Sequence, residues 1–208
     1  MFNNKAFWFG ILGAVFFITS TILSSLNLSN YSHISNLISE SYANGTAYGT
    51  QLRFFGFIPS GIFIAIFAFL AIKILPQSIT TQIGFFAVAI FYGFGTVMVS
   101  IFPYDSSYDK ELNNPSLSNL IHNFIGMLTY LVVPISLIII GFAARNWKLG
   151  KNISLISILC GIISMLFVGI LSAEIQSKYV GLYQRIIEGS ILVWIVTCSF
   201  YLKSYNKN

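Results

Sequence analysis

The chain has 208 residues, of which 56% are hydrophobic and 8% charged, and its formal net charge is +5. Typical soluble domains carry ~25% charged residues, so this composition, with a mean hydropathy of +0.79, excludes an ordinary soluble domain. The 11 basic residues are scattered between long apolar runs instead of gathering on one polar face, so we expect membrane lipids and no nucleic acid as partners. Cys160 and Cys198 lie inside apolar runs without a CxxC spacing, which argues against a disulfide framework or a thiolate metal site.

Six apolar runs follow one another along the chain. They span residues 7–26, 55–75, 82–102, 120–143, 153–173 and 184–203. About 20 residues of helix cross the ~30 Å hydrocarbon layer, and none of the runs carries a charge near its centre. The first run is longer than the apolar part of a cleaved signal peptide, so we interpret it as an uncleaved first helix. The pattern predicts an all-α fold, a single transmembrane domain over residues 1–208 with six transmembrane helices.

The lysines and arginines between these runs predict the orientation of the helices. If the N-terminus is cytoplasmic, the inner side holds seven basic residues and no acidic residue: Lys5, Lys73, Arg145, Lys148, Lys151, Lys203 and Lys207. The outer side then holds the other four basic residues, Arg53, Lys110, Lys178 and Arg185, together with all six acidic residues. Because cytoplasmic segments carry the excess of Lys and Arg, we expect both termini in the cytoplasm of a multi-pass protein of the cell (inner) membrane.

Two of the predicted outer loops are long. Residues 27–53 and 103–119 are rich in Asn, Ser and Tyr, and loops of this length in a compact protein are usually functional or disordered. Residues 34–40 of the first loop mix apolar and polar side chains in a short amphipathic pattern. This pattern predicts a brief helix lying on the outer surface.

Small residues recur within the predicted spans at near-helical spacing. Transmembrane helices associate through close backbone contact, so these residues are expected to mark the contact faces between helices. They are Gly10, Gly13, Ser20 and Ser24; Gly56, Ser60 and Gly61; Gly93, Thr96 and Ser100; and Ser157, Gly161, Gly169 and Ala173.

Ionisable side chains gather at the predicted outer ends of the helices, and the polar cluster they form is expected to face the extracytoplasmic side. Asp105 follows the third span and His122 lies in the first turn of the fourth, so the carboxylate could orient the imidazole and raise its basicity. Glu174 or Glu188 could add an acid or base, or a third ligand for a divalent metal such as zinc. The candidate catalytic residues are therefore Asp105, His122, Glu174 and Glu188, and the candidate metal ligands are His122, Asp105 and Glu174.

A second group of side chains at the same depth suits ligand binding. Arg53 or Arg185 could hold a phosphate or carboxylate head group through two hydrogen bonds. Arg185 and Glu188 lie three residues apart on one helix face and could instead pair with each other. Charges at helix ends also lie ordinarily in the head-group zone, so a structural role stays open. The candidate ligand-binding residues are Arg53, Gln184, Arg185, His33, Tyr104 and Tyr183.

Four short motifs resemble an uncharacterised membrane-protein family, domain of unknown function 998. They are the sequence HISNLIS at 33–39, FPYD at 102–105, the histidine at 122 and GLYQR at 181–185. The resemblance covers most of the chain and implies a six-helix integral membrane protein of bacteria, archaea and some fungi, with no established activity. The family's recurring Pro-x-Asp, His and Gln-Arg positions correspond to Pro103, Asp105, His122, Gln184 and Arg185.

Three functions fit these observations. The first is binding of a lipid or lipid-like amphiphile at an outer-leaflet site, with the polar cluster holding the head group and the aromatic-rich bundle holding the tail. The second is an intramembrane lipid hydrolase or isomerase, in which Asp105, His122 and a glutamate act as acid–base groups or metal ligands. The third is a small-solute transporter of two inverted halves, which ranks last because the loops of the halves do not match and no charge lies at mid-depth.

Overall fold

The computed structural model describes residues 2–26, 28–29, 31–105 and 115–205, and every regular element within these ranges is a helix. Six helical stretches are long and apolar enough to cross a membrane: residues 2–26, 49–74, 79–101, 117–144, 151–173 and 180–204. All six predicted spans are thus confirmed as apolar helices. Each begins earlier than its apolar run, because polar residues at the helix starts continue the helical hydrogen bonding beyond the apolar run.

Four spans are single helices and two contain a π-helical stretch. The single helices are α1 (Phe2–Leu26), α7 (Leu117–Ala144), α8 (Lys151–Ala173) and α9 (Val180–Ser204). The second span consists of α3 (Gly49–Leu52), the π-helical η1 (Arg53–Phe57) and α4 (Ile58–Ile74). The third consists of α5 (Ile79–Ala87), the π-helical η2 (Val88–Phe94) and α6 (Gly95–Ile101). The π-helix is rare and often occurs at functional sites, so both stretches mark places of interest.

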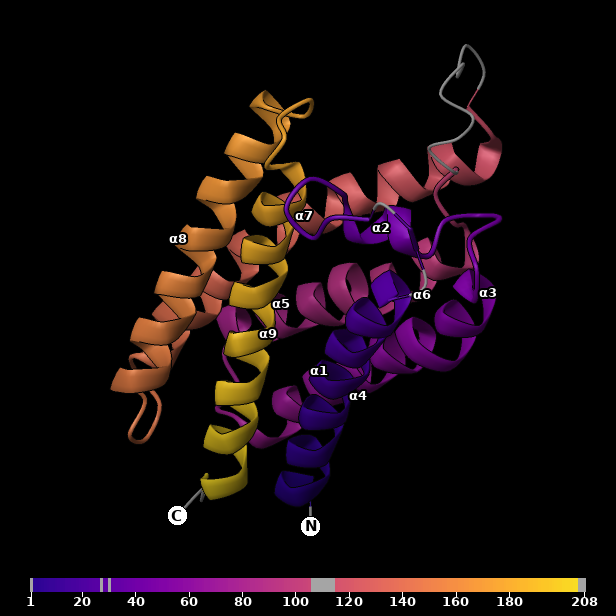
Figure 1. The fold of residues 1–208 in the computed structure, drawn as a ribbon. Coiled ribbons are helices and arrows are strands. Elements are labelled where there is room, and N and C mark those ends of the chain that lie inside the picture. Colours follow the sequence, from indigo (N-terminus) through magenta and orange to yellow (C-terminus); the bar gives the residue numbers. More distant parts are fainter. Residues whose placement is uncertain (1, 27, 30, 106–114, 206–208) are drawn as a thin grey trace.

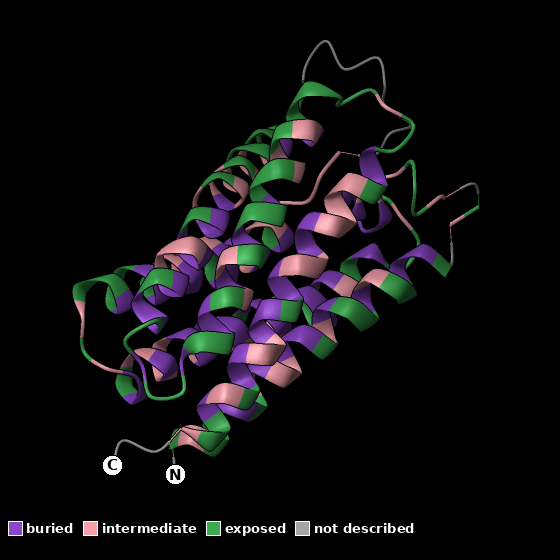
Figure 2. Ribbon diagram, turned by 90° about the vertical axis from the view of Figure 1, so that its left-hand side faces the viewer, coloured by how far each residue is buried: buried purple, intermediate pink, exposed green. Residues whose placement is uncertain are grey.

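The helices turn buried faces inward and exposed apolar faces outward (Figure 2). Phe67, Phe85 and Trp194 are fully buried and pack together, with ring centroids 5.7–6.4 Å apart. Most of the glycines among these small residues lie at contacts between helices, as predicted. A β-carbon added to Gly61, for example, would meet the backbone of the third span. The prediction is wrong for Gly169, where an added β-carbon would meet nothing within 4 Å.

Both chain ends lie at the same end of the bundle (Figure 1). There the Asn3 side-chain amide donates to the carbonyl oxygens of Leu202 and Tyr205 at 2.8 and 2.6 Å. We call the opposite end the distal end. Lys110 and Lys207 of the charge count lie outside the described residues, as do Asp109 and Glu111, and the orientation of the bundle in the membrane stays a prediction.

The first long loop forms a cap over the distal end. We call residues 31–48 the cap segment; it contains the one-turn helix α2 (Ile38–Ser41). The helix expected over residues 34–40 is confirmed only from residue 38 onward, since residues 34–37 are not helical. It does not lie exposed on the surface, because Ile38, Ser39 and Ser41 are buried. The hydroxyl oxygens of Ser41 and Ser24 of α1 lie 2.6 Å apart, so the polar side of α2 finds its partners within the bundle.

Candidate functional site

The start of α9 holds the cap segment through its backbone. Leu182 N–H donates to the Ile34 carbonyl oxygen at 2.9 Å. A β-carbon on Gly181 would collide with the backbone of Asn36, so only glycine permits this approach. The Arg185 Nη1 donates to the carbonyl oxygens of Asn36 and Gly181 at 2.9 and 3.0 Å. The cap is consequently docked on the first two turns of α9.

Arg53 in η1 holds the other end of the cap segment. Its Nη1 donates to the Tyr42 carbonyl oxygen at 2.8 Å and its Nη2 to the Thr50 hydroxyl at 3.1 Å. The Nη2 of Arg185 similarly donates to the Tyr31 hydroxyl at 2.6 Å. In both arginines the buried Nε finds no acceptor among the described residues. The geometry gives both arginines a structural task, and their predicted role in ligand binding stays a prediction.

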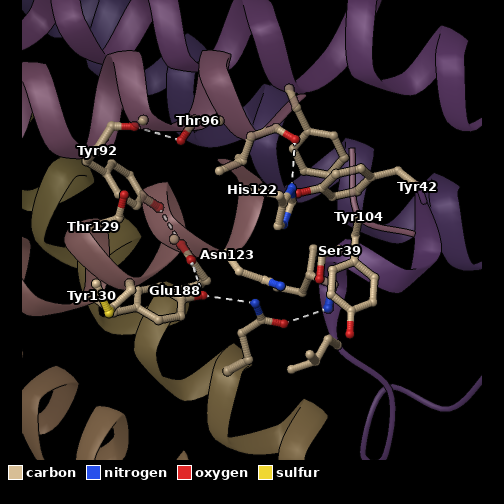
Figure 3. Close-up of a pocket in the computed structure, with 18 of the residues that line it drawn as sticks. Ser39, Tyr42, Tyr92, Thr96, Tyr104, His122, Asn123, Thr129, Tyr130 and Glu188 are labelled. Carbon is tan, nitrogen blue, oxygen red and sulfur yellow. Dashed lines mark hydrogen bonds between the residues drawn. The ribbon is translucent and has the colours of Figure 1, made fainter. Parts of the chain in front are cut away.

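Beneath the cap lies a cavity of about 190 Å³. Its walls come from the cap segment, from η2 and α6, from α7 and from the start of α9 (Figure 3). The polar side chains in its lining are Ser39, Tyr42, Tyr92, Thr96, Tyr104, His122, Asn123, Thr129, Tyr130, Gln184 and Glu188. Among the described residues, the lining contains one carboxylate, one imidazole and no lysine or arginine.

A hydrogen-bond chain of fixed direction leads from the cap to the carboxylate. The Ile38 backbone N–H can only donate, so the Gln184 atom 2.6 Å away is the Oε1 acceptor. The Gln184 Nε2 therefore donates to the Tyr130 hydroxyl oxygen at 2.9 Å, and Tyr130 donates to Glu188 Oε1 at 2.8 Å. Tyr92 donates to the other oxygen, Oε2, at 2.7 Å. Both carboxylate oxygens of Glu188 thus accept hydrogen bonds.

Glu188 lies within the membrane-spanning part of α9, ~12 Å along the axis from its first residue. It is 8% exposed, and its hydrogen-bond partners among the described residues are the two tyrosine hydroxyls. The ion pair that the spacing of Arg185 and Glu188 allowed does not form, because Arg185 points to the cap and Glu188 to the cavity. A carboxylate inside a membrane span without a cationic partner in its pocket is a functional-site candidate.

The π-helical stretch η2 helps to place Tyr92 against Glu188. Its wider turn leaves carbonyl groups that other helices and side chains satisfy. The Thr129 hydroxyl of α7 donates to the Phe91 carbonyl oxygen at 2.6 Å, and Thr96 donates to the Tyr92 carbonyl oxygen at 2.7 Å. The distorted turn is therefore held by hydrogen bonds from α6 and α7.

His122 occupies the opposite side of the cavity from the carboxylate in Figure 3. Its Nδ1 lies 3.0 and 2.9 Å from the carbonyl oxygens of Val99 and Phe102. Carbonyl oxygens only accept, so Nδ1 carries the hydrogen and the neutral ring presents Nε2 as an acceptor. Nε2 has no hydrogen-bond partner within the described part of the chain, and the rings of Tyr104 and Tyr42 flank the imidazole at 5.7 and 6.4 Å.

Tyr42 of the cap segment and Tyr104, which follows α6, complete the polar wall of the cavity. Burial, and then the nearby Glu188 carboxylate, raise the pKa of Tyr42. Burial raises the pKa of Tyr104 as well, together with the carboxylates of Glu40 and Asp105. Both hydroxyls consequently stay protonated and can donate or accept. Among the described lining residues, Glu188 is the only one with a carboxyl group.

The remaining predicted site residues lie elsewhere. Asp105 does not contact His122; its oxygens accept from the Ser116 N–H and hydroxyl at 2.9 and 2.6 Å, at the start of α7. Glu174 is exposed at the end of α8. The described residues contain no group of three His, Cys, Asp or Glu side chains close enough to hold a metal ion. The structure thus separates the three proposed metal ligands.

His33 and Tyr183 also lie outside the cavity lining. His33 is exposed, and its Nε2 lies 3.0 Å from the Ser25 hydroxyl oxygen. Partial burial, and then the positive charge of Arg185, lower its pKa. Tyr183 packs on Phe167 at a ring-centroid distance of 6.1 Å. Of the ligand-binding residues expected from the sequence, the cavity lining includes Gln184 and Tyr104.

The cavity reaches the outward-facing surface between α7 and the end of α8. Met127 of α7 and Ile175 after α8 line it, yet they are 56% and 59% exposed. Asn123 lies on the same rim and points into the cavity in Figure 3. The cavity therefore opens beside exposed apolar side chains of α7 and of the connection after α8, as well as lying under the cap.

Comparison with known proteins identifies the family. The sequence profile of the family described as protein of unknown function (DUF998) matches residues 11–201. The chain belongs to the DUF998 family. No curated protein and no solved structure matches it. In this DUF998 protein the motifs at 33–39 and 181–185 lie against each other, since they form the contact between the cap segment and α9.

Sequence reasoning missed seven polar lining residues of this DUF998 protein, and the first two of them bind Glu188: Tyr92, Tyr130, Ser39, Tyr42, Thr96, Asn123 and Thr129. One signal was available for the first two. Tyr92 and Tyr130 are phenol groups inside apolar runs, and a buried hydroxyl needs a hydrogen-bond partner. The only acidic side chain within a predicted span, Glu188, is the natural acceptor for both.

Proposed function

We propose that this DUF998 protein binds the polar head group of a membrane amphiphile in the cavity beneath the cap. The observation that carries the proposal is a polar cavity, with Glu188 in its wall, that opens beside exposed apolar residues of a transmembrane helix. In this arrangement a head group would meet hydrogen-bonding side chains while its tail lies along Met127 and Ile175 in the lipid.

The size of the cavity supports binding of a head group alone. An engineered cavity of ~150 Å³ holds a benzene-sized molecule, whereas pockets that enclose whole small molecules measure ~300–1,000 Å³. At about 190 Å³ the cavity has room for a compact polar group. The longer apolar part of a ligand would stay outside, which is the behaviour of an amphiphile in a bilayer.

We further propose that the cavity faces the extracytoplasmic side, as the positive-inside rule predicts. Single cysteines placed at the exposed positions Ser35 and Lys151 test this orientation with a membrane-impermeant maleimide on intact cells. Cys160 and Cys198 are buried and give a low background. Labelling at position 35 but not at 151 is expected, and the reverse pattern would contradict the orientation.

Filling the cavity tests the binding proposal. Gly126 lines the cavity, and an added β-carbon there meets no atom within 4 Å, so the side chain of Gly126→Leu starts in free space at the cavity wall. Gly169→Leu is the matched control, because Gly169 has the same free space but lies outside the lining. Native mass spectrometry of purified protein should find a bound amphiphile in the wild type and in Gly169→Leu, and lose it in Gly126→Leu. The same occupancy in all three, or none in the wild type, would refute the proposal.

A second candidate function is acid–base catalysis on the bound amphiphile, a hydrolysis or an isomerisation. Its support is that one cavity contains both the Glu188 carboxylate and the unpartnered Nε2 of His122. Asp105 and Glu174, the other predicted catalytic residues, lie outside the lining. Incubation of the bound amphiphile should then change its mass, and His122→Gln should stop the conversion while binding persists. An unchanged ligand after prolonged incubation with wild-type protein counts against catalysis.

A further inference from the structure

We propose that the head group recognised in this cavity is cationic: an amine or ammonium group that lies between the Glu188 carboxylate and the surrounding tyrosine rings. The inference rests on the proposed function, because it assumes that the cavity binds an amphiphile. It goes further by assigning the charge of the ligand.

The first argument is the charge of the lining. Among the described lining residues, Glu188 is the only carboxylate and none is a lysine or an arginine. The two arginines nearest to the cap donate instead to backbone carbonyl oxygens, Arg53 to Tyr42 and Arg185 to Asn36. A buried charge is stable only when it is paired or well hydrogen-bonded. A ligand cation supplies the pairing that the protein withholds from Glu188.

The second argument is the direction of the hydrogen bonds. The chain that begins at the Ile38 N–H ends with Tyr130 donating to Glu188 Oε1, and Tyr92 donates to Oε2. An ionised carboxylate offers about four acceptor positions, so two remain for a ligand. His122 presents a further acceptor, because its hydrogen lies on Nδ1. These free acceptors match a group rich in N–H donors.

The third argument is the aromatic content of the wall. The rings of Tyr42, Tyr92, Tyr104 and Tyr130 line the cavity together with those of Phe17 and Phe57. The face of an aromatic ring attracts a cation within ~6 Å, most strongly when the cation is desolvated. Aromatic cages of this composition suit ammonium groups and offer nothing comparable to a phosphate or a carboxylate.

The alternative, an anionic head group, has a site of the wrong sign. It would lie against Glu188 without a basic side chain in the described lining to offset the repulsion. The net charge of the whole chain is +5 and works in the opposite direction, since it repels cations and attracts anions without any specific site. A measured preference for cations would therefore arise in the cavity and not from the charge of the protein as a whole.

The test compares twelve-carbon amphiphiles that differ only in their head group, with full-length protein in nanodiscs of uncharged lipid. The probes are dodecylammonium, dodecyl phosphate and dodecanol. Each is titrated against the wild type, Glu188→Gln and Glu174→Gln, with thermal unfolding as the check that each variant is folded. Glu174→Gln is the matched control, because Glu174 is exposed at the same end of the bundle and outside the lining.

We expect dodecylammonium to bind the wild type more tightly than either other probe. Removing one partner of a buried charge pair should weaken its binding to Glu188→Gln on the order of 30-fold, with binding to Glu174→Gln unchanged. Tighter binding of dodecyl phosphate or dodecanol would overturn the cationic assignment and leave the proposed function intact. Equal binding of dodecylammonium to both glutamate variants would overturn the assignment to Glu188. Absence of binding by all three probes would overturn the proposed function itself. The order of the three probe affinities in the wild type decides whether the head group is cationic, even if Glu188→Gln fails to fold.

Discussion

Replacing Gln184 by leucine tests whether the cap segment is coupled to the buried carboxylate. Gln184 links the two, since its Oε1 accepts from the Ile38 N–H at 2.6 Å and its Nε2 donates at 2.9 Å to Tyr130, which in turn donates to Glu188. Leucine has a similar size and no polar atoms, so Gln184→Leu removes both hydrogen bonds with little change in packing.

The free-energy cost of Gln184→Leu comes mainly from the Ile38 N–H, which loses its hydrogen-bond acceptor. Ile38 is 4% exposed, so its N–H cannot turn to water, and an orphaned buried donor costs ~1–3 kcal/mol. Hydrogen bonds between transmembrane helices average only ~0.6 kcal/mol, but Ile38 lies in the cap, outside the six spans. Tyr130 keeps its bond to Glu188 and adds little to the cost. We expect a loss of about 2 kcal/mol, which corresponds to a roughly 30-fold rise in cap opening.

Hydrogen–deuterium exchange of residues 34–42 measures this opening. The protein itself should stay folded, because the bonds from Leu182 to Ile34 and from Arg185 to Asn36 remain. Gln82→Leu is the control, since Gln82 is exposed and bonds only to Gln77 on the surface. Exchange of the cap within twofold of the wild type, with exchange in Gln82→Leu also unchanged, would show that Gln184 does not hold the cap.

Three further predictions follow from the same contacts. Gly181→Ala should lower the unfolding temperature, by a destabilisation of ~1–3 kcal/mol, because its β-carbon collides with the cap backbone, whereas Gly169→Ala should not. Burial and the charge of Arg185 lower the pKa of His33, so the unfolded chain binds more protons at this position than the folded chain. The free energy of unfolding should therefore fall as the pH drops below about 6.5. Chemical unfolding of His33→Ala should show a smaller fall over the same pH range. Asp105→Ala should cost ~1 kcal/mol in thermal unfolding through loss of the hydrogen bonds at the start of α7, with no change in ligand affinity; a large loss of affinity would mean that Asp105 belongs to the site.

Hydropathy was sufficient to predict the six spans, because each must bury its backbone polar groups in a helix to cross the membrane. The depth of Glu188 was also readable from the sequence, since it follows the start of the sixth run by about one turn. These features depend on local composition alone. Tertiary contacts have little influence on either feature.

The roles of Arg53 and Arg185 depend on tertiary contacts. Both were candidates for an anionic ligand because an arginine at a helix end commonly binds phosphate or carboxylate. In the structure their Nη donors are taken by the carbonyl oxygens of Tyr42 and Asn36. Backbone acceptors are present at every residue and leave no mark in the sequence, so the competition between ligand and backbone could not be judged in advance.

The tyrosine pair was missed because its partner lies on another span. Tyr92 and Tyr130 meet Glu188 of α9 across sequence separations of 96 and 58 residues. The cavity also depends on the cap segment, which meets Gln184 at a separation of 146 residues. Neither effect can be read from the pattern of a single span.

Two of the DUF998 motifs hold the cap in place, whereas the residues that would select the ligand lie mostly elsewhere. The motifs at 33–39 and 181–185 dock the cap on α9 through Asn36, Gly181 and Arg185, so they specify that a roofed cavity forms. Glu188 and Tyr130, which face the ligand space, lie outside those motifs. Within these two motifs, the Gln184 side chain links the cap to the buried network. It follows that a DUF998 protein with the same motifs but an apolar residue in place of Glu188 should keep the cap and lose the preference for cations, which the three dodecyl probes would measure directly.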